Sequence, residues 1–421
     1  MGVTKHFVDI GPLRRFPQYR RLWVGYAIRL LGAQLTATAV TYQVFVISHH
    51  SNLDVGYISL AQLIPAILAP MAGGAIADSM DRRRLLVLTA IGMAVCTVGL
   101  ALNSVGGHPK LWPLFLLAAA IQAFNGVDGP TRTAVQMTLV DRDSFVAANV
   151  LRQMLGQISQ VAGPALAGVL IALFAAQNFA WVYWLDVVST LAALQAVARL
   201  DPLPPQGGGR RFSLASIGEG FAFLKGRQVI QACFFADLSA TVLGLPVSLF
   251  PYMALTHYHG DARTFGILSA CPGIGAFLGS VLSGWTSRIT YQGRAVLISV
   301  AVWGIALTLF GVVPYFVVGC ICVAIAGWAD CISAIFRNTI IQVEAPDKLR
   351  GRLSSISTAV VQGGPRLGNM EGAMVASIST PAIAIVSGGL GCVAVIAAIA
   401  RFMPKFSKYS LEESMKEDKN L

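Results

Sequence analysis

The stretch GGAIADSMDRRRLL, residues 73–86, ends one apolar segment of the chain and begins the next. Its glycines are typical of membrane helices that approach one another closely. Asp78 stands at the boundary, where a carboxylate suits the positive end of a neighbouring helix. Arg82, Arg83 and Arg84 form a basic run of the kind that follows membrane helices on their cytoplasmic side. The stretch therefore predicts a short, charged cytoplasmic turn between two membrane-spanning helices.

The composition of the chain is that of a membrane protein. Of its 421 residues, 55% are hydrophobic and only 12% are charged, which is too apolar for a water-soluble domain. A run of about 20 apolar residues crosses the bilayer as a helix. We count twelve such runs, at residues 22–48, 55–78, 83–103, 111–138, 145–174, 180–199, 229–256, 263–287, 294–313, 315–342, 352–378 and 381–402. The sequence therefore predicts an all-α polytopic membrane protein.

Basic residues are divided unequally between the two sides of the membrane. Of the 31 lysines and arginines, 24 fall in the two termini and in alternate loops, and only Lys110 and Arg263 fall on the opposite side. Cytoplasmic loops attract positive charge, so we expect both termini in the cytoplasm. The first helix is expected to be an uncleaved anchor, because the residues before it lack the apolar core of a signal peptide. The net charge of +11 follows from this topology and does not call for nucleic-acid binding.

A proline- and glycine-rich stretch, DPLPPQGGGRRF at residues 201–212, divides the chain. A shift of 206 residues aligns Gln136 with Gln342 and Asp141 with Asp347, which indicates a weak internal repeat. Repeated halves are typical of secondary transporters that bind substrate between the halves, near the membrane midplane. We expect an N-terminal six-helix bundle, a cytoplasmic linker, a C-terminal six-helix bundle and a cytoplasmic tail, at residues 1–200, 201–228, 229–402 and 403–421.

Charged residues inside the apolar runs are the candidate functional residues. A charge at the bilayer centre costs at least ~2.5 kcal/mol, so such residues pair with one another or line a pathway. Asp128 and Arg132 are four residues apart on one helix face, so an intrahelical ion pair is the simpler alternative for them. The candidates for the substrate or proton pathway are Arg29, Asp128, Arg132, Asp237, Asp330, Arg366 and Glu371.

Two helices carry glycine and proline within their apolar runs. In GGPRLGNMEG, residues 363–372, Arg366 and Glu371 lie roughly 140° apart around the helix, so we expect each to need a partner on another helix or cavity water. Pro365 and the glycines would let this helix bend and pack closely. In the fifth run, Gly163 and Pro164 predict a bend or a close packing contact.

Residues 73–86 resemble the G-x-x-x-D-x-x-x-R-[RK] signature of the major facilitator superfamily, with Gly74, Asp78, Arg82 and Arg83 at the signature positions. The resemblance implies two pseudo-symmetric six-helix halves and a gating role for these four residues. It also implies that the first and seventh helices line a central cavity, which would place Arg29 and Asp237 there.

Three further stretches, GPTRTAVQMTLVDRDSFVAANVL (129–151), FRNTIIQVEAPDKLRGRLSSI (336–356) and residues 363–372, resemble the enterobactin (siderophore) exporter-like branch of that superfamily. This branch is similar to macrolide and multidrug efflux carriers. The chain departs from the antiporter pattern at Gln122, where those carriers have an arginine, and at Arg288, where the second gating loop has no aspartate.

The resemblance implies a secondary active transporter that exports a siderophore-like or amphiphilic small molecule across the cytoplasmic membrane, coupled to protons. A macrolide or multidrug efflux antiporter and a solute importer of the same fold are the alternatives. A membrane enzyme or receptor would need a clustered nucleophile or metal site, and the sequence offers none. The expected partners are the small-molecule substrate, protons and the lipid bilayer. We expect a monomer that uses no cofactor and no metal.

Overall fold

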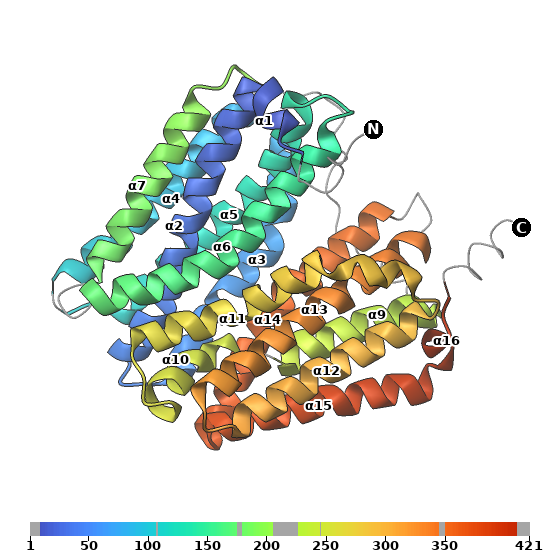
Figure 1. Ribbon diagram of the computed structural model, residues 1–421. Helices are drawn as coiled ribbons and strands as arrows, with labels where there is room; N and C mark the ends of the chain where they lie inside the picture. Colours follow the sequence, from blue (N-terminus) through green and yellow to red (C-terminus); the bar gives the residue numbers. More distant parts are fainter. Residues whose placement is uncertain are drawn as a thin grey trace, which may run out of the picture. The chain divides into compact units, whose positions relative to one another are not determined.

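The computed structural model describes residues 9–106, 108–174, 179–204, 226–244, 246–344 and 350–410, and every regular element within these ranges is helical (Figure 1). Most of the expected linker, the end of the tail and Asp347 lie outside the described residues. The linker and the tail therefore stay predictions.

The first six predicted membrane helices correspond to six long helices. They follow a short helix, α1 (Gly11–Arg15), and are α2 (Pro17–Ile47), α3 (Asn52–Ser79), α4 (Arg82–Val105), α5 (Leu111–Leu139), α6 (Phe145–Phe174) and α7 (Ala180–Ala198). Asp81 caps the start of α4, where its carboxylate accepts a hydrogen bond from the backbone N–H of Arg84 at 2.9 Å. The charged turn predicted at residues 73–86 is thus present between α3 and α4.

The second half begins with a helical segment that changes type along its length. The segment predicted as one helix at 229–256 consists of α9 (Gln228–Ser239), a π-helical turn η2 (Ala240–Gly244), a 3-10 turn η3 (Val247–Leu249), α10 (Phe250–Tyr252) and a second π-helical turn η4 (Met253–His257). Pro246 lies between η2 and η3, and a proline without an N–H group cannot continue the hydrogen bonding of a helix. The span predicted at 229–256 is therefore present as one candidate membrane span, Gln228–His257, whose helix changes type along its length.

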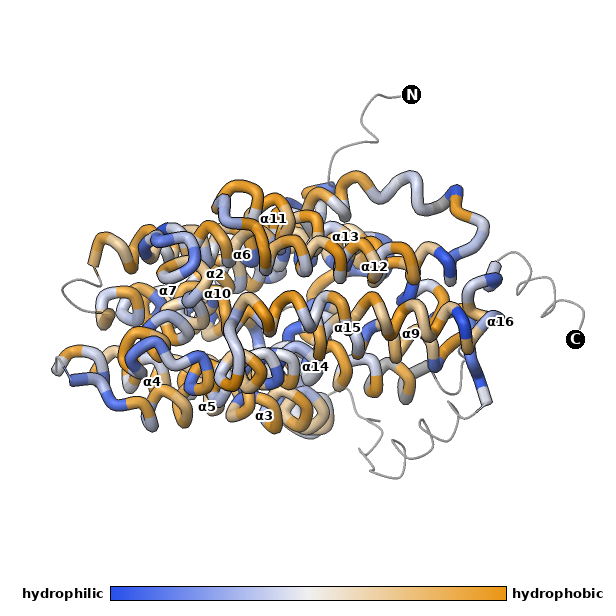
Figure 2. The backbone as a smooth tube through the Cα atoms, turned by 90° about the horizontal axis from the view of Figure 1, so that it is seen from below, coloured by the Kyte–Doolittle hydropathy of each residue, from blue (hydrophilic) through white to orange (hydrophobic). Residues whose placement is uncertain are grey.

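The remaining elements are α11 (Ala262–Val281), η5 (Ser283–Arg288), α12 (Gln292–Val312), α13 (Phe316–Glu344), α14 (Arg350–Ile378), α15 (Pro381–Phe402) and α16 (Pro404–Ser407). Within the described ranges, 11 helical segments are long and apolar enough to cross a membrane. Figure 2 shows α12 and α15 as hydrophobic over most of their length. Helix α14, with 29 residues, matches the predicted span at 352–378 in length but is not among the 11.

The chain forms two compact units. Unit 1 comprises Met1–Gln43 and Ile64–Phe212, and unit 2 comprises Val44–Leu63 and Ser213–Leu421. The end of α2 and the start of α3 therefore group with the second unit, a feature that the division at the linker did not predict. The two units are described separately below.

Unit 1 is held together by close contacts between helices. Helix α4 packs against α5 and α7, and the core there contains Leu22, Leu86, Val135 and Val197. Helices α3 and α5 also approach closely at Gly73. A Cβ atom added there would lie only 2.6 Å from the Cα of Val127. Small residues permit such approaches between membrane helices.

Unit 2 packs around α12 and α13. Helix α12 contacts both α13 and α15, and α11 contacts α13. The core includes Trp303, Leu307, Phe336 and Cys392, all nearly or fully buried. This arrangement leaves α9 and η2 between α13, α14 and α15, where the candidate site described below is found.

The glycines of residues 363–372 explain how α14 packs. Gly364, Gly368 and Gly372 are four residues apart and so form a stripe on one helix face. A Cβ atom at Gly364 would lie 2.9 Å from the Cβ of Thr241, and one at Gly368 would lie 2.8 Å from the carbonyl oxygen of Val242. The stripe thus allows α14 to lie directly against η2, and the predicted close packing of these glycines is confirmed.

Candidate functional site

In unit 1, two arginines share one buried aspartate. Arg29 on α2 lies 3.2 Å from Asp128 on α5, and Arg132, one turn further along α5, lies 2.6 Å from the same carboxylate oxygen. All three side chains are buried, with exposed fractions of 6%, 1% and 5%. The intrahelical pair of Asp128 with Arg132, expected from their spacing, is confirmed. With all three groups ionised, the cluster carries one net positive charge.

The cluster also has hydrogen-bond donors left over. The Nε of Arg29 and both terminal nitrogens of Arg132 are buried and have no hydrogen-bond partner among the described residues. The ring of Tyr26 lies 5.7 Å from the guanidinium carbon of Arg29 and 5.0 Å from that of Arg132, which stabilises the cations through the ring face. The excess positive charge and the unused donors would both favour an acidic group placed beside them.

A second buried acid lies near this cluster. Asp186 on α7 is 4% exposed and accepts hydrogen bonds from Thr36 at 2.6 Å and from Ser189 at 3.0 Å. Its hydrogen bonds come from hydroxyl groups and not from an arginine. Such bonds satisfy the carboxyl group without neutralising a charge. Asp186 was not among the candidate residues of the sequence analysis.

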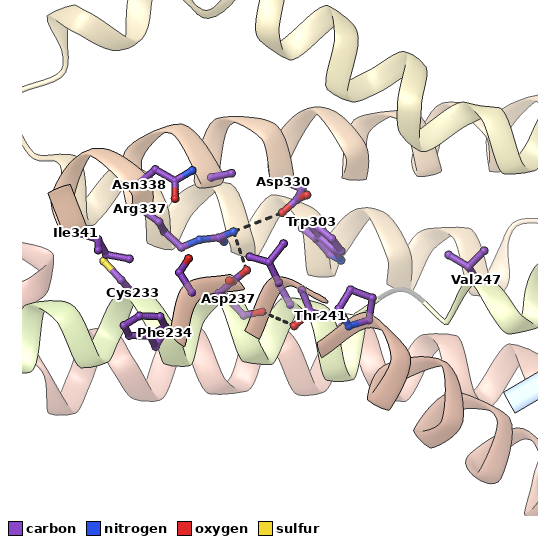
Figure 3. Close-up of a pocket in the computed structure, with 15 residues that line it drawn as sticks. Cys233, Phe234, Asp237, Thr241, Val247, Trp303, Asp330, Arg337, Asn338 and Ile341 are labelled. Atoms are coloured by element: carbon purple, nitrogen blue, oxygen red, sulfur yellow. Dashed lines mark hydrogen bonds and ion pairs between the residues drawn. The ribbon is translucent and has the colours of Figure 1, made fainter. Parts of the chain in front are cut away.

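In unit 2 the arrangement is reversed, because two aspartates share one arginine. Arg337 on α13 lies 2.7 Å from Asp237 on α9 and 3.8 Å from Asp330 on its own helix. Arg337 also donates a hydrogen bond to Ser333 at 2.7 Å. Figure 3 shows both carboxylates directed towards the guanidinium group. With all three groups ionised, this cluster carries one net negative charge.

The cluster lies on the wall of a cavity of about 320 Å³. The walls come from α9, η2, η3, α12, α13 and α14, and they combine aromatic side chains with polar ones (Figure 3): Phe234, Trp303, Asp237, Thr241, Asp330, Arg337 and Asn338. The indole N–H of Trp303 is buried and has no hydrogen-bond partner among the described residues. The volume is within the range of small-molecule sites, and the lining offers aromatic surface and hydrogen-bond donors.

Asp330 and Asp237 differ in how firmly they are held. The side chain of Asp330 is 41% exposed, whereas that of Asp237 is 9% exposed. The longer distance to Arg337 and the greater exposure both make Asp330 the more loosely bound acid. It is also the acid with easier access to water or a ligand in the cavity.

The charged residues of α5 and α13 follow a similar spacing. A shift of 205 residues places Asn125, Asp128 and Arg132 of α5 on Asp330, Ser333 and Arg337 of α13. Asn125 accepts a hydrogen bond from Arg29 on α2 at 2.8 Å, whereas Asp330 and Ser333 both bind Arg337 on their own helix. At the position of Asp128, unit 2 therefore has Ser333, and at the position of Asn125 it has Asp330. This correspondence is visible in the spacing, but the sequence analysis did not find it.

The residues of the proposed gate differ in the contacts that they make. Arg82 donates to the hydroxyl of Thr138 at 3.1 Å, and Arg83 donates to the carbonyl oxygen of Ala198 at 2.5 Å. The helix end expected to attract Asp78 is capped by Asp81 instead, and Asp78 itself is exposed. The close approach expected at Gly74 is made by Gly73, because a Cβ atom at Gly74 would meet nothing within 4 Å.

The other predicted residues are distributed over α6 and α14. Gly163 packs against the side chain of Gln34, and both Gly163 and Pro164 are buried. Pro365 lines the cavity of unit 2. Arg366 donates to the carbonyl oxygen of Gln362 on its own helix at 2.5 Å. Its expected partner on another helix or cavity water stays a prediction.

Glu371 is partly buried on α14. The structure does not pair Arg366 with Glu371 within the described residues, as the helix geometry predicted. Across the same residues, no group of three or more His, Cys, Asp or Glu side chains is arranged to hold a metal ion.

Known proteins of similar sequence are exporters. The enterobactin exporter EntS of Citrobacter koseri is 26% identical over 395 residues, which cover 94% of each chain. EntS of Escherichia coli O1:K1 is 25% identical over 391 residues, which cover 93% of each chain.

Solved structures of similar fold are transporters. The nucleoside transporter NupG matches with a TM-score of 0.76 at 14% identity, covering 93% of this chain and 100% of that one. The D-xylose-proton symporter matches with a TM-score of 0.72 at 13% identity, covering 94% and 100%. The predicted all-α major facilitator fold is thereby confirmed.

A family model described as transmembrane secretion effector matches residues 9–420. Its members are transporters and not enzymes, and the chain has 11 candidate membrane spans among its described residues. This multi-pass membrane transporter therefore belongs to the transmembrane secretion effector family of the major facilitator superfamily.

Proposed function

We propose that this transporter exports a siderophore-like, moderately polar aromatic compound from the cytoplasm, and that proton entry drives the export. Its relatives are named enterobactin exporters over nearly the full length of both chains, which supports the direction and the class of substrate. The cavity of unit 2 supports the same class, because Phe234 and Trp303 offer aromatic surface beside polar groups.

The observation that carries the coupling is the sharing of Arg337 by two carboxylates on the cavity wall. Two acids beside one cation leave a negative charge in a poorly solvated site, and a proton on one acid removes that charge. Asp330 is the acid that would take the proton, because it is farther from the Arg337 cation, and its exposure to the cavity gives a proton access to it. Arg337 would then pair with Asp237 alone. Protonation would thus change both the charge of the cavity and the contact between α13 and α9.

The available driving force is sufficient for a modest concentration gradient. Entry of one proton is favourable by ~2.3 kcal/mol per 100 mV of membrane potential. Since a tenfold ratio corresponds to ~1.4 kcal/mol, one proton can sustain a gradient of some tens-fold.

A macrolide or multidrug efflux antiporter is the second candidate, and the same cavity supports it. Asp237 and Asp330 outnumber Arg337, so the wall would attract an amphiphilic cation when both acids are ionised. The surplus positive charge beside Asp128 in unit 1 favours an acidic compound instead. The two candidates therefore differ in the charge of the compound that is transported.

The test is efflux from vesicles that contain the purified protein and are preloaded with a catecholate siderophore or a macrolide. An imposed pH gradient and potential should accelerate efflux of the siderophore by the wild type. In Asp330→Asn, exchange of substrate should persist while the acceleration is lost. Asp143→Asn, which changes an exposed loop acid, is the matched control and should behave like the wild type.

Each remaining outcome has a defined meaning. Gradient-driven efflux of normal rate in Asp330→Asn would refute the coupling role of this acid. Transport of the macrolide alone would replace the siderophore with the second candidate. Accumulation of the compound on the cytoplasmic side under the same gradient would make the protein an importer.

A further inference from the structure

A pocket with three arginines lies in unit 1, between the start of α2 and the end of α7. Its volume is about 290 Å³. Arg20 and Arg21 belong to α2, and Arg199 directly follows the last residue of α7. The apolar part of its wall consists of Val24, Ala192 and Ala196. This pocket is separate from the charge cluster of Arg29, Asp128 and Arg132.

The two helices meet closely at the base of this pocket. A Cβ atom added at Gly25 would lie 2.8 Å from the Cβ of Ala196. The small residues therefore hold α2 and α7 together, while the long arginine side chains extend around the opening. The pocket is thus fixed by backbone packing and does not depend on the positions of flexible side chains alone.

The positive charge of this pocket is not neutralised within the described residues. The side chains of Arg20, Arg21 and Arg199 are exposed, and none of them forms an ion pair there. The nearby acid Asp201 accepts a hydrogen bond from the side chain of Gln18. Three cations around one opening repel one another, so binding of an anion would be favourable.

We propose that this pocket binds the phosphate group of an anionic phospholipid. Guanidinium groups match phosphate oxygens in pairs, and three of them can surround one phosphodiester. Val24 and Ala192 provide an apolar wall for the start of the acyl chains, which a free phosphate ion would not need. Both helices are candidate membrane spans, and the pocket lies at their ends, where headgroups are found. Basic pockets of this kind between membrane helices bind anionic headgroups.

The experiment compares lipid binding by two charge-matched variants of the full chain. The pocket variant carries Arg20→Gln, Arg21→Gln and Arg199→Gln. The control variant carries Arg14→Gln, Arg15→Gln and Arg142→Gln, which removes three exposed arginines outside the pocket. Each protein is purified in detergent, and binding of phosphatidylglycerol and of phosphatidylcholine is measured by native mass spectrometry. Thermal melting in the same detergent confirms that both variants are folded.

We expect the wild type and the control variant to retain phosphatidylglycerol in preference to phosphatidylcholine. The pocket variant should bind phosphatidylglycerol about a hundredfold more weakly, since each arginine near a lipid surface contributes about fivefold. Equal losses in both variants would show diffuse attraction only and would overturn the proposal, as would unchanged binding by the pocket variant. Displacement of the lipid by millimolar inorganic phosphate, with phosphate retained, would assign the pocket to a soluble anion instead.

Discussion

Replacing Gly368 by alanine should destabilise unit 2, although alanine is the better helix former. The added Cβ would lie 2.8 Å from the carbonyl oxygen of Val242 and closer still to that of Thr241. Both atoms belong to the backbone of η2, so α14 or η2 must move by several tenths of an ångström. Overpacking of this kind costs about 1–3 kcal/mol, and the gain in helix propensity offsets about 1 kcal/mol. The net loss is therefore between zero and about 2 kcal/mol, with a central value of about 1 kcal/mol.

Gly156→Ala in α6 is the matched control, because a Cβ atom there would meet nothing within 4 Å. It should keep the propensity gain of about 1 kcal/mol and raise the melting temperature. Melting can be followed with a thiol-reactive dye, since Cys233 and Cys392 are free and fully buried in the folded protein. Gly368→Ala should melt about 2–4 °C below the wild type. If it melted at or above the wild-type temperature, as the control should, the close packing of α14 on η2 would be refuted.

Three other predictions concern unit 1, a helix cap and the topology. Asp128→Asn leaves two buried guanidinium groups without their carboxylate, and should lower stability by about 3–5 kcal/mol in the same melting assay. Asp261 caps α11: its partial burial raises the pKa, but hydrogen bonds from two backbone N–H groups and from the Thr264 side chain outweigh this and hold the pKa below its usual value. The stability that the ionised Asp261 carboxylate adds is fully present above its pKa in the unfolded chain, about 4, and is lost as the pH falls through its lower pKa in the folded protein. Asp261→Ala should therefore cost about 1 kcal/mol of stability near neutral pH and less in acid. Reporter fusions after residues 108 and 204 should report opposite sides of the membrane, and the same side for both would refute the predicted orientation.

The helices could be predicted from the sequence because the bilayer requires long apolar runs. The irregular turns within the seventh span could not, since a proline such as Pro246 is compatible with either a kink or a change of helix type in a membrane helix. The pair Asp330 and Arg337 was available from the spacing, because seven residues make two helical turns and place both side chains on one face. The pairing of Asp237 with Arg337 was not, because these residues are 100 positions apart on different helices and nothing in one sequence links them.

The reversal of charge between the halves indicates where proton sensitivity should be found. In unit 1 the acid is held by two arginines, so adding a proton to Asp128 would leave two buried cations together, which is unfavourable. In unit 2 the arginine is held by two acids, so adding a proton to Asp330 removes a surplus charge and still leaves Arg337 paired with Asp237. The same protonation is therefore costly in one half and favourable in the other. Of the two clusters, the one of Asp330 is therefore the one suited to the proposed proton uptake, and the cluster of Asp128 should keep its charge throughout transport.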